Sequence, residues 1–309
     1  MQKALQIVFY NVDNFFDPLD AAHTLDKDFT PTGRKKWGEY RYNQKVSKIA
    51  KTIAGIGEIN PLAFVGLAEV ETEQVCKDLV ENQFLAPLNM GYIHRESSDV
   101  RGIDVALLYN KDLFSVESVA VHPVEIDIYQ DHLTSRDILE VQGFLSGTPL
   151  RIFVNHWPSQ RRRGNRKLRK RASDILKKRL KDLDLKSDHI VIMGDFNDNP
   201  DAPSLTFLKD YGFTNTLSSQ WNENQGSLKY MRKWLLFDQI FLSSAFFESQ
   251  DSISYESGQI YNPTKLQDPS GRNKAQPFRT FIGKNYIGGQ SDHFPVLNQI
   301  LSPKLLSKD

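Results

Sequence analysis

Short apolar runs, separated by polar and turn-forming residues, recur along the whole chain. The runs are rich in Val, Ile and Phe and are bounded by Gly, Pro or Asn, which is the pattern of buried β-strands. This pattern predicts eight strands, at residues 5–10, 63–67, 103–109, 138–145, 152–155, 190–193, 235–242 and 294–301. Eight such strands are enough to form two sheets.

Helical periodicity is rarer than strand-like patterning in this chain. Tyr42, Val46, Ile49 and Ile53 form one apolar stripe of a helix that should end near Gly55. Two further stripes lie within residues 75–80 and 168–183, the second with Lys and Arg on most other faces. Few helices among many strands predict an α/β fold, a four-layer α/β sandwich in which two packed mixed β-sheets are flanked by helices. With no internal repeat or low-complexity linker, we expect one domain over residues 1–309.

Two stretches, residues 17–39 and 255–289, lack periodicity and mix Lys and Arg with aromatic residues. Long loops in a compact domain are usually functional or disordered. Such loops could grip an anion that has a planar or apolar attachment. Alternatively, the aromatic side chains could anchor the loops to the core.

The composition indicates a folded protein with no strong charge bias. The chain is 39% hydrophobic, and 39 Lys and Arg residues face 38 Asp and Glu residues, which excludes a uniformly basic nucleic-acid coat and leaves only local patches. Cys76 is the only cysteine, so no intramolecular disulfide forms, and no apolar run is long enough to span a membrane. These features favour a cytoplasmic location, although a secreted protein whose leader had been removed would look the same.

Polar residues cluster where the predicted strands end. Strand ends in a sandwich gather on one rim, so residues from distant parts of the sequence should converge there. Carboxylate and amide oxygens suit Mg²⁺ or Mn²⁺, whereas the chain lacks any Cys and His spacing for zinc. Histidine backed by a carboxylate is suited to proton transfer near neutral pH. The candidate residues are Asn11, Glu69, Asp104, His156, Asp195, Asn197, Asp238, Asp292 and His293.

The motifs around these residues, in their order along the chain, resemble those of the endonuclease/exonuclease/phosphatase superfamily, in particular its deoxyribonuclease I-like members. The GDFN sequence at residues 194–197 is a moderate signal alone, but together with SDH at 291–293 and the strand-terminal Glu69 it is specific. The resemblance extends over residues 5–301. The other matching motifs are FYN at 9–11, LAE at 67–69, RGIDVA at 101–106, NHW at 155–157 and FDQI at 237–240.

The resemblance implies a phosphoesterase that requires Mg²⁺ or Mn²⁺. Glu69 would be the principal metal ligand, supported by Asn11 and Asp292. Asp195 would orient or deprotonate the attacking water, and Asn197 would bind the scissile phosphate. Singly, an Asp or Asn at a strand end is more often a turn residue than a catalyst.

The resemblance also implies that each histidine has a carboxylate partner. His293 would be held by Asp238, and His156 by Asp104. We assign water activation to Asp195 together with the His293–Asp238 pair, and the leaving-group side to the His156–Asp104 pair. The presence of His156 is unlike the apurinic-site endonucleases and similar to the deoxyribonuclease and sphingomyelinase branches.

Hydrolysis of a phosphodiester, with DNA or RNA as substrate, is the expected function. Arg161, Arg162 and Arg163 follow the His156 motif directly, and guanidinium groups there would contact phosphate. Glu71 stands where deoxyribonuclease I-like enzymes tend to have a basic residue, and an acidic side chain facing a duplex backbone would repel it.

Two other functions remain open from the sequence. One is a phosphomonoesterase or phospholipase of the same fold, acting on an inositol phosphate or a sphingomyelin-like lipid. The other is a catalytically inactive binding module, which is disfavoured because every motif position has a residue type that can function.

Overall fold

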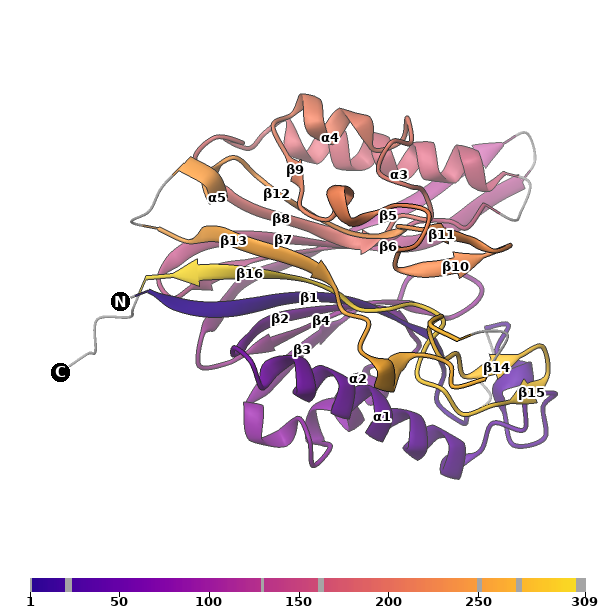
Figure 1. Ribbon diagram of the computed structural model, residues 1–309. Coiled ribbons are helices and arrows are strands. Elements are labelled where there is room, and N and C mark those ends of the chain that lie inside the picture. Colours follow the sequence, from indigo (N-terminus) through magenta and orange to yellow (C-terminus); the bar gives the residue numbers. More distant parts are fainter. Residues whose placement is uncertain are drawn as a thin grey trace.

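The computed structural model describes residues 2–19, 24–128, 131–160, 164–248, 252–270 and 274–303. Two six-stranded mixed sheets pack face to face, and helices cover the outer face of each (Figure 1). The expected four-layer α/β sandwich is therefore confirmed. In spatial order the first sheet contains β13 (Ser254–Ile260), β16 (Val296–Ser302), β1 (Lys3–Phe15), β2 (Leu62–Val70), β4 (Asp104–Asn110) and β3 (Met90–His94).

The second sheet contains the middle of the chain. Its strands, again in spatial order, are β5 (Phe114–Ile128), β6 (Asp131–Leu145), β7 (Thr148–His156), β8 (His189–Asp195), β12 (Asp238–Leu242) and β9 (Thr214–Asn215). Two short hairpins stand apart from the sheets, β10 (Leu228–Tyr230) with β11 (Lys233–Leu235), and β14 (Phe281–Ile282) with β15 (Asn285–Tyr286).

The helices form the two outer layers of the sandwich. α1 (Glu39–Gly57) and α2 (Glu73–Glu81) cover the first sheet, and α3 (Asn165–Leu180) and α4 (Thr206–Asp210) cover the second (Figure 1). The short α5 (Ala245–Glu248) precedes β13, and single 3-10 turns occur at Lys27–Phe29, Ala86–Leu88, Ser218–Gln220 and Thr264–Leu266. None of the helices in the described ranges is long and apolar enough to cross a membrane.

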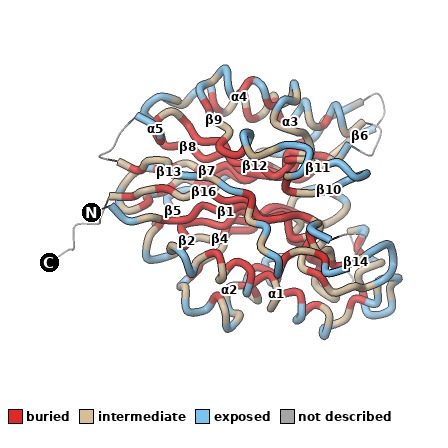
Figure 2. Tube along the Cα trace, in the orientation of Figure 1, coloured by how far each residue is buried: buried red, intermediate tan, exposed pale blue. Residues whose placement is uncertain are grey.

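Three apolar clusters hold the sandwich together, one between the sheets and one beneath the helices of each outer layer. The buried residues are concentrated in the strands of the two sheets (Figure 2). In β1, Phe9 packs between the two sheets, whereas its neighbours Val8 and Tyr10 pack beneath α1 and α2. In β8, Met193 similarly faces the first sheet and Ile192 faces α3. Because central strands are buried on both faces, their sequences are continuous apolar runs without alternation.

All eight predicted strands occur, with one difference. Residues 235–242 are divided between β11 and β12, because the chain turns at Leu236 and Phe237. The sequence patterns did not predict β3, β5 or β13. The prediction that residues 255–289 lack regular structure is wrong at their start, where β13 pairs with β16, and at residues 281–286, where β14 pairs with β15.

The loop before α1 is anchored by its aromatic side chains. Trp37 is fully buried, and its Nε1 donates a hydrogen bond of 2.9 Å to the carbonyl oxygen of Phe16. The ring of Phe29 stacks on Phe16 and meets Trp37 and Phe281 edge-on. Of the two interpretations of this loop, the structure supports anchoring to the core.

The strand directions place the candidate residues on one rim. β1 and β2 are parallel, as are β7 and β8, so the carboxyl ends of each pair lie together. β4, β12 and β16 are antiparallel to these neighbours and therefore begin where those strands end. Polar residues near the carboxyl ends of β1, β2, β7 and β8, and near the starts of β4, β12 and β16, consequently meet at the same edge of the sandwich.

A buried carboxylate links α3 to the outer face of the second sheet. Glu140 on β6 is 1% exposed and receives hydrogen bonds from Arg151 on β7 and from Arg179 on α3, the latter at 2.8 and 3.0 Å. His122 on β5 lies 2.6 Å from the same carboxylate. Burial alone would raise the pKa of Glu140, but His122, Arg179 and Arg151 together lower it to about 2.

Glu140→Gln should lower the free energy of unfolding at pH 7 by about 3 kcal/mol, because it removes one partner of a buried ion cluster. A folded-state pKa of about 2, below the ordinary 4.5, gives stability that is complete above pH 4.5 and is lost as the pH falls through 2. The difference between wild type and variant, measured by urea denaturation, should therefore shrink as the pH is lowered from 5 towards 3.

The matched control is Glu125→Gln, which removes an exposed carboxylate 3.6 Å from His132 on the same sheet. Exposed ion pairs contribute about 0–1 kcal/mol, so this variant should resemble wild type. A difference between Glu140→Gln and wild type that does not vary with pH would contradict the assignment.

Candidate active site

Residues from eight separate segments meet around one cavity of about 400 Å³ at the rim. Its lining includes residues that the sequence singled out, namely Glu69, His156, Asp195, Asn197, Asp292 and His293. Asn11 and Asp238 are almost fully buried and hydrogen-bond to two of these lining residues. The predicted convergence of strand ends is therefore present in the structure.

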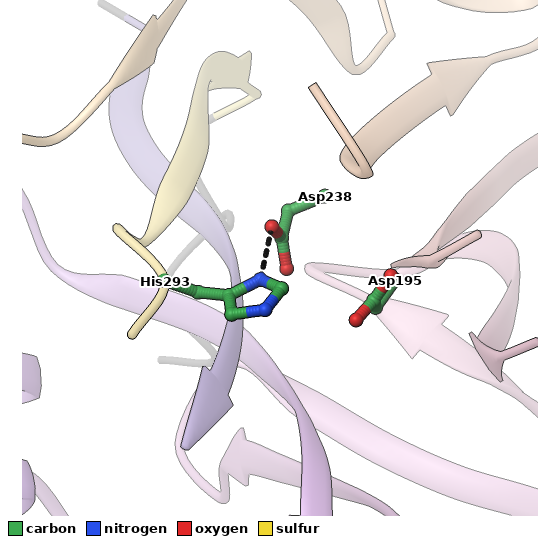
Figure 3. Close-up of side chains that lie close together, drawn as sticks. All are labelled: Asp195, Asp238 and His293. Carbon is green, nitrogen blue, oxygen red and sulfur yellow. Dashed lines mark hydrogen bonds and ion pairs between the residues drawn. The ribbon is translucent and has the colours of Figure 1, made fainter. Parts of the chain in front are cut away.

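His293 and Asp238 form a close, buried pair in the site. Nδ1 of His293 lies 2.6 Å from Oδ2 of Asp238, whose side chain is fully buried (Figure 3). Burial alone would lower the pKa of His293, but Asp238, Asp195 and Asp292 together raise it well above its ordinary value. His293 is therefore a cation at neutral pH, with Nδ1 held by Asp238 and Nε2 directed away from it (Figure 3).

Asp195 is fixed by two hydrogen bonds from neighbouring residues. Oδ2 accepts one from Nδ2 of Asn11 and Oδ1 accepts one from the backbone N–H of Asn197, both at 2.9 Å. Burial and the nearby Asp238 raise the pKa of Asp195 to about 7. Asn197 itself has a left-handed backbone (φ 50°) and donates its side-chain amide to the carbonyl of Trp157.

His156 does not pair with Asp104, so that expectation is wrong. The carboxylate of Asp104 is turned towards Ser97, accepting hydrogen bonds from both its hydroxyl and its backbone N–H. His156 instead contacts the guanidinium group of Arg136, with Nη2 of Arg136 2.7 Å from Nε2 of the ring. Burial first, and then the charges of Arg136 and Arg101, lower the pKa of His156 well below its ordinary value, so this histidine is neutral.

Carboxylates dominate the part of the site contributed by β1, β2 and the segment before β16. Oε2 of Glu69 accepts a hydrogen bond of 2.7 Å from the backbone N–H of Asn14, while Oε1 faces Nε2 of His156 at 3.8 Å. Burial and the neighbouring Asp13 raise the pKa of Asp292. Within the described part of the chain, neither Oε1 of Glu69 nor the Asp292 carboxylate accepts a hydrogen bond.

A buried lysine that the sequence reasoning missed lies beside these carboxylates. Lys45 on α1 is 1% exposed and donates to Oγ1 of Thr280 at 2.8 Å and to the backbone carbonyl of Asp13. Burial lowers the pKa of Lys45, whereas Asp13, Glu69 and Asp292 oppose that change. Its position on an apolar helix stripe gave no sequence signal, because the pattern around it is that of an ordinary core-facing helix.

Two groups of side chains in the site could hold a divalent cation. Asp195, Asp238 and His293 offer atoms that all lie within 4.8 Å of one another (Figure 3). In this group, both oxygens of Asp195 accept hydrogen bonds and Nδ1 of His293 contacts Oδ2 of Asp238, while Oδ1 of Asp238 is buried without a partner among the described residues. Glu69 and Asp292 keep unengaged carboxylate oxygens, which is the chemistry that Mg²⁺ and Mn²⁺ prefer.

Two predictions about charged residues have different outcomes. Arg161, Arg162 and Arg163 lie outside the described residues. Glu71 does not face the site, because it is 4% exposed and its Oε2 accepts the backbone N–H of Asp17. The expectation that Glu71 repels a nucleic-acid backbone is therefore wrong.

Comparison with known proteins gives a family and a fold. The sequence profile of the Endonuclease/Exonuclease/phosphatase family matches residues 6–301. No curated protein matches the sequence of the chain. Among solved structures, an endonuclease/exonuclease/phosphatase family protein from Bacteroides thetaiotaomicron has a TM-score of 0.60 at 16% identity, with 98% of this chain and 99% of that chain covered.

Two further structural neighbours have names that describe a ligand or an activity. TDP2 from D. rerio complexed with single strand DNA product has a TM-score of 0.57 at 14% identity, covering 96% of this chain and 98% of its own. A mannosyl-6-phosphatase from Bacteroides thetaiotaomicron has a TM-score of 0.56 at 15% identity, covering 96% of this chain and 99% of its own. At such identities these likenesses show a shared fold.

Proposed function

The chain belongs to the endonuclease/exonuclease/phosphatase family of phosphoester hydrolases, and from that premise we propose that it is a Mg²⁺-dependent phosphodiesterase acting on DNA or RNA. The observation that carries the proposal is the cavity in which Asp195, the His293–Asp238 pair and the carboxylates of Glu69 and Asp292 converge. This set provides separate groups for a cation, for a water molecule and for a proton.

Glu69 and Asp292 would hold the cation, because both keep unengaged carboxylate oxygens and line the cavity, whereas Asp238, whose Oδ1 is also unpaired among the described residues, is fully buried behind His293. When bound, Mg²⁺ would polarise a phosphoryl oxygen and neutralise the charge that accumulates in the transition state. Asn11 donates a hydrogen bond to Asp195 and accepts one of 3.0 Å from the backbone N–H of Asp13. It would therefore support the site by linking Asp195 to the segment that contains Asp13.

Asp195 would orient the attacking water and accept its proton. The hydrogen bonds from Asn11 and Asn197 hold the carboxylate in one orientation, and its raised pKa suits proton transfer near neutral pH. Asn197, which lines the cavity, would bind the scissile phosphate.

The roles of the two histidines, protonation of the leaving group and contact with the phosphate, would then differ from those assigned from the sequence. His293 has a proton at neutral pH and would donate it from Nε2 to the departing oxygen. His156 is neutral and lies 3.8 Å from both Glu69 and Asp195, so it would contact the phosphate. The leaving-group role that the sequence suggested for His156 thus passes to His293.

A phosphomonoesterase or phospholipase remains the alternative. The observation that favours it is the net charge of +1, which provides little general attraction for a polyanion. Turnover of single-stranded DNA, duplex DNA, RNA, inositol phosphates, sphingomyelin and bis-p-nitrophenyl phosphate, each with Mg²⁺ and with EDTA, would separate these substrate classes.

Glu69→Gln should reduce the kcat for bis-p-nitrophenyl phosphate by about 10³-fold or more, because losing the cation ligand removes several kcal/mol of charge stabilisation. Initial rates with added Mg²⁺ would measure this loss. Glu58→Gln, which changes an exposed glutamate beyond the end of α1, is the control and should behave as wild type. Full wild-type activity in excess EDTA would refute the proposal.

His293→Ala should lower kcat on a nucleic-acid substrate by about 10²–10⁴-fold. On a p-nitrophenyl ester the reduction of kcat should be much smaller, because that leaving group needs no proton. His156→Ala should be impaired on both substrates, because phosphate contact does not depend on the leaving group. His132→Ala, at an exposed position, is the matched control. If the activated ester rescues His156→Ala and leaves His293→Ala impaired, the roles of the two histidines are exchanged.

A further inference from the structure

One wall of the cavity contains arginines that the proposed reaction does not use. Residues 99–101 from the loop before β4 and residues 134–136 from β6 all line it. Oδ1 of Asp99 accepts the backbone N–H of Arg101 at 2.8 Å, and Oδ2 accepts Nη1 of Arg136 at 3.4 Å. Only the guanidinium of Arg136 pairs with Asp99, because Arg101 contacts this carboxylate through its backbone. With two guanidinium groups and one carboxylate, this wall has a net positive charge.

Arg101 is positioned without being neutralised. Its Nη2 donates a hydrogen bond of 3.1 Å to Oδ1 of Asn14, and no carboxylate of a described residue forms an ion pair with its guanidinium. The turn that presents it is closed by a 3.0 Å hydrogen bond from the backbone N–H of Gly102 to the carbonyl of Asp99. Gly102 has φ +66°, and a Cβ there would lie 2.5 Å from Cγ2 of Thr24, so both backbone and space favour glycine.

Arg136 is directed to the site by a β-bulge. His122 pairs with Ile138 and Val124 with Ser135, so two residues of β6, Arg136 and Asp137, lie opposite the single residue Pro123 of β5. Proline has no N–H to donate to the ladder and is therefore tolerated at a bulge. Arg136 is 5% exposed and contacts the ring of His156, so its charge is fixed in place.

Ser135 supplies an independent observation. It is 2% exposed and lines the cavity, and its Oγ has no hydrogen-bond partner among the described residues. Leaving a buried hydroxyl unpaired costs about 1–3 kcal/mol, so such groups are normally satisfied by a partner. Beside two guanidinium groups, the partner that satisfies all three is an oxygen atom with negative charge.

We propose that Arg101, Ser135 and Arg136 form a subsite for a second anionic group of the substrate, distinct from the scissile phosphate. The inference rests on the proposed function, since it describes what the substrate must contain next to the ester that is cleaved. The chemical class is a phosphate or a similar oxyanion, because guanidinium groups bind such oxygens in pairs and a hydroxyl adds a third donor. A polynucleotide or a nucleoside bisphosphate fits this requirement, whereas an ester with one phosphate fills only half of the site.

Equilibrium binding tests the subsite without requiring turnover. Calorimetric titration in the presence of Mg²⁺ would compare thymidine 3′,5′-bisphosphate with thymidine 5′-monophosphate, and inorganic pyrophosphate with inorganic phosphate. The two pairs differ in the spacing between their phosphates. In at least one pair, wild type should bind the compound with two phosphates about tenfold or more tightly than the compound with one, since the second phosphate adds charge-assisted hydrogen bonds.

Arg101→Met should reduce that preference about tenfold, and Ser135→Ala should reduce it by a smaller factor. Arg101→Lys should retain part of it. Arg95→Met is the matched control, because Arg95 is exposed on the same loop and does not line the cavity, so its preference should equal that of wild type. Melting temperatures of all variants would verify that they are folded.

Equal affinity of wild type for both members of both pairs, or no binding of any of them, would overturn the subsite. The subsite would also be overturned if Arg101→Met kept the wild-type preference for the ligand with two phosphates. Turnover of bis-p-nitrophenyl phosphate by wild type, which needs only one phosphate, tests the proposed function separately. Hydrolysis without a bisphosphate preference would therefore reject the subsite alone, and a preference without hydrolysis would reject the proposed function alone.

Discussion

Repulsion between carboxylates at the rim of the sandwich is the constraint on which the site depends. The strand directions bring Glu69, Asp195, Asp238 and Asp292 into one region, with Asp13 beside them; Asp195 and Asp238 are buried, and Asp292 is partly exposed. Like charges that are removed from water raise one another's free energy, so they must be protonated or compensated by cations. The raised pKa of Asp195 is a consequence of its burial and of this crowding, since Asp238 lies close to it.

The protein compensates the crowding with fixed cations at chosen places. His293 lies against Asp238, Lys45 bonds to the backbone beside Asp13, and Arg136 lies against His156. Each of these cations is buried, so its charge stays where the packing puts it. The rim therefore has three parts: the carboxylates of Glu69 and Asp292, the protonated His293 paired with Asp238, and the positively charged wall that contains Arg101 and Arg136.

The backbone at the rim is also unusual. Asp13, Asn14, Glu69 and Asn197 all have left-handed conformations, with φ between 50° and 67°. Such conformations cost of order 1 kcal/mol or more for residues other than glycine and persist where the surroundings impose them. Here they let the backbone N–H groups of Asn14 and Asn197 reach the carboxylates of Glu69 and Asp195, which fixes both side chains.

Sequence patterns predict the layers of this fold because the central strands are buried on both faces and appear as apolar runs. They do not predict β5, because it is an edge strand whose residues alternate in exposure and so form no continuous apolar run. Its Pro123 is a signal of a bulge. The candidate residues could be found because each follows or precedes a strand. The Arg136 partner of His156 could not be found, because the contact joins two strands, and Lys45 could not, because its bond to Thr280 joins positions far apart in the chain.

The central proposal is that the cation binds Glu69 and Asp292 and not the His293–Asp238 pair, and it can be tested by locating the metal. An anomalous difference map from crystals grown with Mn²⁺ would identify the ion directly. The account predicts a peak bonded to carboxylate oxygens of Glu69 and Asp292, with His293 still paired to Asp238. A peak between Asp195, Asp238 and His293, or no bound Mn²⁺ at the rim, would contradict it.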